Sequence, residues 1–141
     1  MTGGQMTIGA VVPALTRTIE LPDMIAYAGA TWDWHKLHYD REYLESKHLE
    51  RPVVDGQVFG ALLAEAIQDW LGGRVVITKL HFRFRNLVFA GETVKCTGSV
   101  TAIEPREDGK VLLTIESQVE VIGEDRRVAV APAGAEVVWQ P

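Results

Sequence analysis

The chain has 141 residues, of which 47% are hydrophobic and 23% are charged. A chain of this length and composition is predicted to form one globular domain over residues 1–141, with a single hydrophobic core. The formal net charge of −5 argues against nucleic acid as a partner. No apolar stretch reaches the roughly 20 residues that a membrane-spanning helix requires, so no membrane association is predicted.

Cys96 is the single cysteine of the chain, and this excludes two kinds of stabilisation. One cysteine can form neither an internal disulfide nor a thiolate metal cage. Cys96 lies in a run of alternating apolar residues and is expected to pack inside a strand, which fits a protein of the reducing cytoplasm. Residues 1–6 lack the basic and apolar regions of a signal peptide, so none is predicted there.

The first half of the chain is predicted to be mainly helical. Alternation at residues 16–20 indicates a strand, and a helix follows over residues 22–30, with a proline in its first turn. Residues 31–39 are crowded with aromatic and polar side chains that follow no regular period, which predicts a loop. Asp40 is a suitable N-cap for a short helix that ends near His48.

One long helix is predicted over residues 54–71. Apolar residues repeat there at helical spacing and form a broad face: Val58, Phe59, Leu62, Leu63, Ala66, Ile67 and Trp70. Small residues between them allow other parts of the chain to approach closely. Two glycines at residues 72–73 form a natural C-terminal stop.

After this helix the pattern changes to strands. Four are predicted, over residues 75–85, 92–103, 111–121 and 127–139, and the last of them could be interrupted at residues 132–134. A long apolar helix and an antiparallel sheet must bury their apolar faces against each other. The expected fold is therefore α+β, with a curved antiparallel sheet wrapped around one central helix.

Two segments carry groups suited to adding water to a double bond that is conjugated with a thioester. Asp33 and His38 lie in the predicted loop, where a carboxylate and an imidazole that converge on one water could remove its proton and return a proton to the substrate. Gly56 opens the long helix, where free backbone N–H groups can stabilise the negative charge that develops on the thioester oxygen. The lack of a side chain at Gly56 would let the substrate approach this N–H.

The motif around these residues resembles that of the MaoC-like hydratases, which is close to Tyr-x-x-x-Ser/Thr-Gly-Asp-x-Asn-Pro-Ile-His. The matching residues are Tyr27, Thr31, Asp33, Leu37 and His38. Gly56 matches the glycine of the family's His-Gly pair, and residues 83–92 resemble its strand pair of the type Arg-Phe-x-x-Pro-Val-x-x-Gly-Asp. The resemblance covers about residues 16–122 and implies the hot-dog fold of the (R)-specific enoyl-CoA hydratases.

By this resemblance, Asp33 and His38 would be the catalytic pair that holds the water, and the Gly56 N–H would bind the thioester oxygen. The substrates would be acyl-CoA or acyl-carrier-protein thioesters, which are hydrated at a 2-enoyl bond or dehydrated in the reverse direction. This chemistry would need no metal and no organic cofactor. His35 and His38 do not predict a metal site, because the sequence offers no evident third ligand.

The sequence departs from the family motif at several positions. Trp32 replaces a glycine, which is expected to exclude a glycine-only backbone conformation there, and His35 and Lys36 replace Asn-Pro. Asp55 replaces the histidine before Gly56 and is expected to cap the long helix and point away from the substrate. These changes resemble a divergent branch from actinobacterial lipid and steroid side-chain degradation, some members of which work as unequal pairs of hot-dog subunits.

Further residues are expected to contact the substrate: Trp32, Trp34, His35, Gln57, Arg83 and Arg85. The two tryptophans flank Asp33 and either form a wall of the acyl pocket or anchor the loop in the core. The two arginines lie on one side of a predicted strand, where they either face solvent or meet the phosphates of coenzyme A. His35 is expected on the surface or in the lining of the pocket.

Two rival functions remain open on the sequence. A hot-dog thioesterase often carries its carboxylate on or near the central helix, where Asp55, Glu65 and Asp69 are available. A non-catalytic acyl-binding subunit of a heteromeric hydratase would fit the altered motif positions, although such a subunit has no need of Asp33 and His38. A homodimer is predicted, because a lone hot-dog sheet leaves an edge strand unpaired, and a heteromer with another hot-dog subunit is the alternative.

Overall fold

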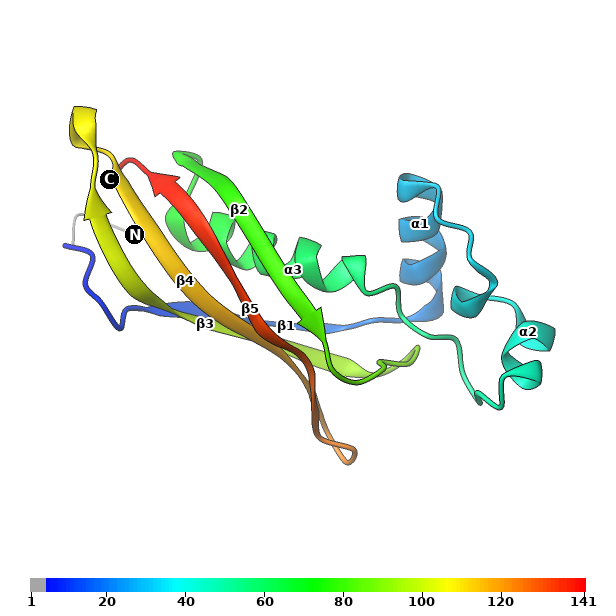
Figure 1. Ribbon diagram of the computed structural model, residues 1–141. Coiled ribbons are helices and arrows are strands. Elements are labelled where there is room, and N and C mark those ends of the chain that lie inside the picture. The colour runs from blue at the N-terminus through cyan, green and yellow to red at the C-terminus, as the bar shows by residue number, and fades with distance from the viewer. Residues whose placement is uncertain (1–4) are drawn as a thin grey trace.

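The computed structural model describes residues 5–141, so the absence of a signal peptide, predicted from residues 1–6, rests mainly on residues outside the described part of the chain. Figure 1 shows helices gathered around one side and one end of a long sheet. In chain order the elements are β1 (Val11–Thr18), α1 (Leu21–Thr31), the 3-10 turn η1 (Lys36–His38), α2 (Arg41–Ser46), α3 (Gln57–Leu71), β2 (Val75–Phe84), β3 (Thr93–Pro105), the 3-10 turn η2 (Glu107–Gly109), β4 (Val111–Ile122) and β5 (Arg127–Trp139).

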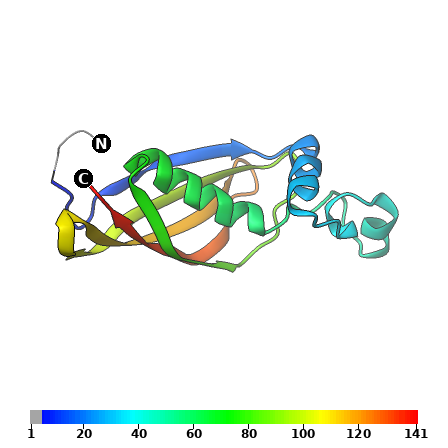
Figure 2. The same cartoon turned by 90° about the horizontal axis from the view of Figure 1, so that it is seen from above.

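The strands form one antiparallel sheet in the order β1-β3-β4-β5-β2. The sheet curves, and α3 lies across its concave face between the edge strands β1 and β2 (Figure 2). The helix contacts both edge strands as well as β3 and β5. This arrangement confirms the predicted α+β fold, with a curved antiparallel sheet around one long helix.

The core lies between α3 and the sheet. As the helical spacing predicted, α3 buries one broad face: Phe59, Gly60, Leu62, Leu63, Ala66, Ile67 and Leu71. These residues pack with buried strand residues that include Val94 and Ile115. A Cβ at Gly60 would lie 2.6 Å from the Phe82 ring, so α3 approaches β2 too closely there for a side chain. Cys96 is buried in β3, as predicted, and burial raises the pKa of its thiol to about 12.

Two strands differ in extent from the sequence prediction. β1 begins at Val11 rather than at residue 16, because its backbone pairs with β3 although only Val12 turns fully into the core. Such a strand has little of the apolar alternation that reveals strands in a sequence. β5 runs through Pro132 without interruption, and shifts in register against both neighbouring strands accommodate the proline.

The helix ends also differ from the prediction. α3 begins at Gln57 rather than at residue 54, because the Val54 N–H pairs with the Val88 carbonyl, in the segment after β2, at 2.8 Å. Asp40 caps α2 as predicted, by accepting a hydrogen bond from the Tyr43 N–H at 3.0 Å. That helix already ends at Ser46, two residues earlier than expected.

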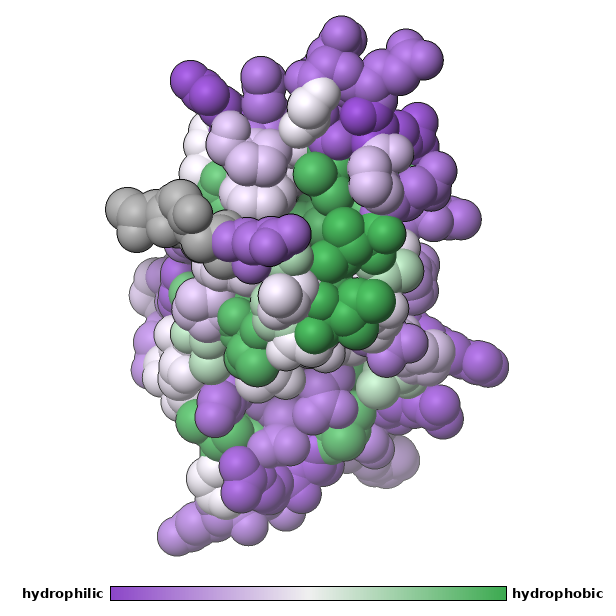
Figure 3. All heavy atoms as spheres, turned by 90° about the vertical axis from the view of Figure 1, so that its left-hand side faces the viewer, coloured by the Kyte–Doolittle hydropathy of each residue, from purple (hydrophilic) through white to green (hydrophobic). Residues whose placement is uncertain are grey.

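The two ends of the molecule are unlike. α1, η1 and α2 lie together at the end where α3 begins (Figure 1). The opposite end, viewed directly in Figure 3, gathers apolar side chains at its centre with polar side chains around them. Within residues 5–141, no helix has both the length and the apolar character needed to cross a membrane.

An ion pair fixes the strand ends near α1. Glu92, just before β3, accepts hydrogen bonds from Arg127 Nη1 and from the Phe89 N–H, both at 2.9 Å. Arg127, the first residue of β5, also donates to the Leu87 carbonyl at 2.8 Å. The hydrogen bond from Arg127 lowers the pKa of Glu92, whose side chain is only 10% exposed. The pair therefore holds the segment between β2 and β3 in place.

We expect Glu92→Gln to lower the free energy of unfolding at pH 7 by about 1 to 3 kcal/mol, because it removes a hydrogen-bonded charge beside a largely buried arginine. The pKa of Glu92 is lowered on folding, so its contribution is fully present above the ordinary carboxyl pKa of about 4.3. It is lost as the pH falls through the lowered value. Urea denaturation of both proteins at pH 7 and at pH 3 measures this, and the difference between them should shrink at pH 3.

Glu45→Gln is the matched control, because Glu45 pairs with Arg41 on the exposed surface of α2. An exposed ion pair contributes little to stability, so this variant should unfold much like the parent. Equal stability of the two variants would contradict a structural role for Glu92.

Candidate active site

Three segments bring the candidate catalytic residues together at the N-terminal end of α3. Asp33 follows α1, His38 ends η1, and Asp55 lies two residues before α3. Trp32, at the C-terminal end of α1, has φ 59° and ψ 30°, which is the left-handed conformation that glycine favours. The expectation that Trp32 excludes this conformation is therefore wrong. The loop makes the turn at a cost of about 1 to 2 kcal/mol.

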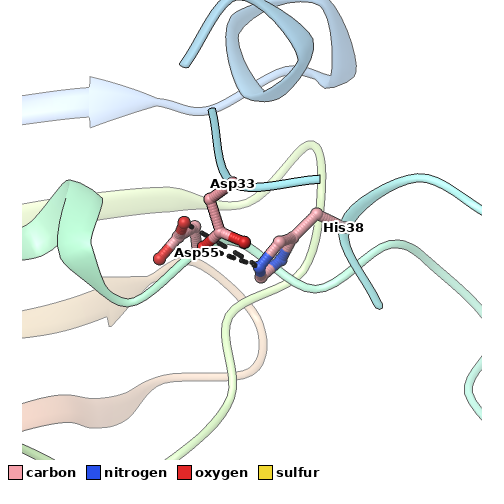
Figure 4. A group of neighbouring side chains, drawn as sticks. All are labelled: Asp33, His38 and Asp55. Atoms are coloured by element: carbon pink, nitrogen blue, oxygen red, sulfur yellow. Dashed lines mark ion pairs between the residues drawn. The ribbon is translucent and has the colours of Figure 1, made fainter. Parts of the chain in front are cut away.

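Asp33 and His38, the predicted pair, lie beside each other and beside Asp55 (Figure 4). His38 Nε2 is 4.0 Å from Asp33 Oδ2 and 3.8 Å from Asp55 Oδ2. The other ring nitrogen, Nδ1, lies 2.7 Å from the Val53 carbonyl oxygen. Because a carbonyl only accepts hydrogen bonds, Nδ1 carries the proton of the neutral ring. Nε2 then keeps its lone pair and can accept a proton on the side of the two carboxyls.

The two carboxyls are unequal. The Asp33 side chain is 45% exposed, whereas that of Asp55 is only 13% exposed. Burial raises the pKa of Asp55, although its hydrogen bond from the Gln57 N–H acts in the opposite direction. The neighbouring Asp55 carboxyl lowers the pKa of Asp33, and the hydrogen bond from the His35 N–H adds to this effect. Of the two carboxyls, Asp55 is therefore the one with the higher pKa.

A cavity of about 10 Å³ lies beside these side chains. It is lined by Met24, Tyr27, Ala28, Asp33, His38, Asp55 and Val58. This is about the space that the centre of one water molecule needs, and the polar residues in the lining offer it hydrogen-bonding partners. Burial, followed by the negative charges of Asp55 and Asp33, raises the pKa of Tyr27, which keeps its hydroxyl neutral.

A larger pocket of about 310 Å³ adjoins His38 and Gly56. Its lining is mainly apolar and includes Leu37, Val53 and Leu87. The Gly56 N–H has no hydrogen-bond acceptor among residues 5–141. A backbone donor is therefore free at the wall of an apolar pocket, next to the Asp–His pair.

Gly56 is also required for a reason that the sequence did not reveal. The Phe84 ring packs directly on it, and a Cβ at Gly56 would lie 2.3 Å from Phe84 Cζ. Phe84 ends β2, and it is 54% exposed. The ring forms the part of the pocket wall that covers Gly56, so a side chain at this position would displace the ring from its place in the wall.

Only one of the four predicted polar substrate contacts lines the pocket. Arg85 lines it, and its Nε donates to the Ala131 carbonyl at 2.6 Å. Arg83 and Gln57 are exposed and line neither of the two cavities. This agrees with the solvent-facing alternative for Arg83.

The aromatic residues around Asp33 form a cluster of their own. Trp32 and Trp34 meet edge to face, with 5.9 Å between ring centroids, and Trp34 meets Tyr39 in the same way at 6.1 Å. Trp32 is 79% exposed, and neither tryptophan lines the two cavities. His35 Nδ1 accepts a hydrogen bond from the Leu37 N–H and thereby caps η1. The cluster therefore shapes the loop from outside the pocket.

Asp55 is the residue of the site whose orientation was predicted incorrectly. Its Oδ1 accepts a hydrogen bond at 2.9 Å from the N–H of Gln57, the first residue of α3, but the N-cap position itself is Gly56, which has no side-chain cap, so Asp55 is not the N-cap that was expected. Its Oδ2, however, points toward His38 rather than away from the site. The available signal was its position, because Asp55 stands where the family motif has a histidine. Of the other helix carboxylates, Glu65 pairs with Arg17 at 2.9 Å and Asp69 is exposed.

The site also contains three side chains that are close enough together to bind one metal ion: Asp33, His38 and Asp55. Each offers one ligand atom, and these atoms lie within 4.8 Å of one another. The sequence predicted no metal because no third ligand was evident beside the two histidines. In the structure the additional potential ligands are the two carboxyls beside His38. His35 is not among them, and its Nδ1 accepts a hydrogen bond from the Leu37 N–H.

Fold and site together define a hot-dog protein with an Asp–His pair at the start of its central helix. Residues 5–121 match the family model described as "MaoC like domain". The chain therefore belongs to the MaoC-like family of hydratases and dehydratases, as the sequence motif predicted.

Three relatives illustrate this membership. The (R)-specific enoyl-CoA hydratase of Aeromonas caviae is 27% identical over 128 residues, which are 90% of each chain. A mitochondrial 3-hydroxyacyl-[acyl-carrier-protein] dehydratase of Arabidopsis thaliana is 32% identical over 93 residues, covering 65% of this chain and only 54% of that protein. The 3-oxo-4,17-pregnadiene-20-carboxyl-CoA hydratase beta subunit of Mycobacterium tuberculosis is 26% identical over 108 residues, covering 77% and 81%.

Solved structures agree on the fold. The (R)-hydratase from A. caviae superimposes with a TM-score of 0.82 at 25% identity, covering 99% of this chain and all of that one. The ChsH1-ChsH2 complex of M. tuberculosis gives a TM-score of 0.81 at 23% identity, covering 97% of this chain and 100% of the matched chain.

Proposed function

We propose that the protein adds water to the double bond of 2-enoyl thioesters, or removes it from 3-hydroxyacyl thioesters in the reverse direction. The observation that carries this proposal is the water-sized cavity between Asp33 and His38, beside an apolar pocket with a free backbone donor at Gly56. Hydration needs a base for water, a donor for the thioester oxygen and room for the acyl chain, and these three features meet at one end of α3.

In the proposed reaction, water in the small cavity forms a bond from its oxygen to the β-carbon of the substrate. Its proton passes to His38 Nε2 or to Asp33, since both face that cavity. The electrons of the double bond move onto the thioester as an enolate, whose oxygen is stabilised by the Gly56 N–H. The α-carbon then takes the proton back from the same pair, so one water is added overall.

The proposed substrates are acyl-CoA or acyl-carrier-protein thioesters in lipid or steroid side-chain metabolism. Three relatives support this substrate class: one is named for an enoyl-CoA, one for a steroid-like carboxyl-CoA and one for an acyl-carrier-protein substrate. Their names differ too much to single out one substrate. Arg85 at the rim of the pocket is a candidate contact for phosphates of the carrier. Arg83, which is exposed on β2, is a weaker candidate.

The test is a panel of 2-enoyl-CoA thioesters that vary in chain length and ring content, followed by loss of the conjugated absorbance. Hydration of at least one member well above the uncatalysed rate is expected. Release of free thiol from saturated acyl-CoA, without hydration, would instead support a thioesterase. Inactivity on every thioester, both alone and with a partner subunit, would overturn the proposal.

A non-catalytic subunit of a heteromeric hydratase is the second candidate. It is favoured by the relative that is itself a beta subunit and by the Phe84 ring that covers Gly56. This candidate predicts that the purified protein is inactive alone and that activity appears on mixing with another hot-dog protein. Asp33→Asn in this subunit would then leave the activity of the mixture unchanged.

We expect the protein to be a dimer of identical subunits or of two hot-dog subunits. The edge strands β1 and β2 each have an unpaired side, and an exposed edge invites pairing with another chain. Light scattering at micromolar concentration should give a mass of at least twice the 15.6 kDa of one chain. A stable, folded monomer would exclude the homodimer.

A further inference from the structure

Asp55 is a side chain of the site that the mechanism above leaves unused. Its Oδ2 lies 3.8 Å from His38 Nε2, about as close as Asp33 Oδ2 at 4.0 Å. It also lines the water-sized cavity. Its contact with the start of α3 uses only one carboxylate oxygen, because Oδ1 accepts the Gln57 N–H. The second oxygen is therefore available for a role in the site.

Asp33 and Asp55 are too close for both to be ionised without cost. Their oxygens lie within 4.8 Å of each other, and two carboxylates that share a site repel. The other titratable groups facing Asp55 are His38 from η1 and Tyr27 from α1, while α3 presents the uncharged Val58. One proton between the carboxyls removes the repulsion, and it is better placed on Asp55, whose side chain is 13% exposed, than on Asp33, which is 45% exposed and better solvated as an anion.

We propose that Asp55 is a positioning residue, whose protonated carboxyl donates a hydrogen bond to Asp33 and holds that carboxylate toward His38 and the water. The hydrogen bonds already present fix both groups for this contact. Asp55 Oδ1 is held by the Gln57 N–H at 2.9 Å, and Asp33 Oδ1 by the His35 N–H at 3.3 Å. This leaves the two Oδ2 atoms to face the centre of the site.

The effect of Asp55 on turnover rests on the proposed hydratase function, whereas its hydrogen bond to Asp33 does not. Two variants separate this role from the contact with the start of α3. Asp55→Asn is neutral at every pH, keeps an oxygen for the Gln57 N–H and has an amide N–H₂ that can donate to Asp33. Asp55→Ser is the matched control, because serine can also accept a hydrogen bond from the start of a helix but is too short to reach Asp33.

Kinetics across pH give the first readout. Near neutral pH, the kcat/KM of Asp55→Asn should stay within a few-fold of the parent value. The kcat/KM of Asp55→Ser should fall by up to about 100-fold, because misplacing a catalytic group can cost that much in rate. The melting temperature of Asp55→Ser should be unchanged. Parent activity should decline as the pH rises through the raised pKa of Asp55, because the donor is then lost. Asp55→Asn should lack this decline.

The carboxyl ¹³C resonances of labelled aspartates give a second readout that needs no activity. In the parent, Asp33 should titrate below the ordinary aspartate range and Asp55 above it. Asp55→Ser should raise the pKa of Asp33 toward its ordinary value, and Asp55→Asn should leave it low. An unchanged titration of Asp33 in Asp55→Ser would overturn the hydrogen bond, even if no enoyl thioester proves to be a substrate.

Two kinetic outcomes would also overturn the proposal. Parent-like turnover by Asp55→Ser would reduce the role of Asp55 to its contact with the start of α3. An equal loss in Asp55→Asn and Asp55→Ser would mean that Asp55 acts as an ionised or proton-transferring group rather than as a neutral donor. If the parent hydrates no thioester but Asp33 titrates as expected, the proposed hydratase function is wrong, whereas the proposed hydrogen bond between Asp55 and Asp33 is still supported.

Discussion

Asp33→Asn and His38→Ala should each lower the rate of enoyl-thioester hydration by about 100- to 10,000-fold, the usual loss for a positioned acid or base. Asparagine keeps the shape of Asp33 but cannot accept a proton from water. Among residues 5–141, His38 is the one histidine that lines the water-sized cavity, and alanine removes its imidazole. The rate is measured from the loss of conjugated absorbance, on a substrate that the parent hydrates well.

The stability of Asp33→Asn and His38→Ala must be measured together with their hydration rates, because the two substitutions are expected to change the free energy of unfolding by different amounts. Asp33 is 45% exposed, so Asp33→Asn should unfold like the parent. His38→Ala leaves the carbonyl of the buried Val53 without its partner at 2.7 Å, which costs about 1 to 3 kcal/mol. Rates are therefore compared per folded molecule.

The double mutant tests whether the pair acts as a unit. If Asp33 and His38 hold one water together, the double mutant should be little worse than the poorer single variant. Affinity for a saturated acyl-CoA should stay close to that of the parent, because holding water is separate from binding the acyl chain. Near-normal hydration by either single variant would remove that residue from the catalytic pair.

The fold could be predicted from the sequence because most of its elements bury one face. The apolar spacing along α3 and the alternation in β3 and β4 both report the side that contacts the core. β1 carries little such signal, because it is held by backbone hydrogen bonds to β3 and turns mainly Val12 inward. Backbone pairing is independent of side-chain type, so a sequence pattern does not reveal it.

The proximity of Asp33 and His38 was predictable, because the motif fixes their residue types and spacing. The site was not predictable where a side chain has two equally reasonable orientations. A carboxylate before a helix can accept a hydrogen bond from the start of the helix, face the site, or do both as Asp55 does with its two oxygens. Contacts between distant elements, such as the Phe84 ring on Gly56, depend on how β2 packs beside α3 and leave no local trace in the sequence.

Gly56→Ala should lower hydration by about 100-fold or more while the protein stays folded. Gly56 has φ −59° and ψ −25°, which alanine adopts without strain. The added Cβ would meet Phe84 Cζ at 2.3 Å, but Phe84 is half exposed and its ring can swing outward. The methyl group and the displaced ring then obstruct the Gly56 N–H, and loss of one such donor typically costs about 100- to 1,000-fold in kcat.

Gly60→Ala is the matched control, because it places a methyl group against the Phe82 ring at 2.6 Å one turn further along the same helix. Gly60 is buried and Phe82 is partly buried, so this ring has less room to move and the control should lose more stability. Its activity per folded molecule should nevertheless stay near the parent's, since Gly60 does not line the pocket. Adding Phe84→Ala to Gly56→Ala removes the steric contact with the ring but leaves the methyl group beside the N–H. Recovery of full activity in that double variant would mean that ring displacement, rather than access to the Gly56 N–H, limits the reaction.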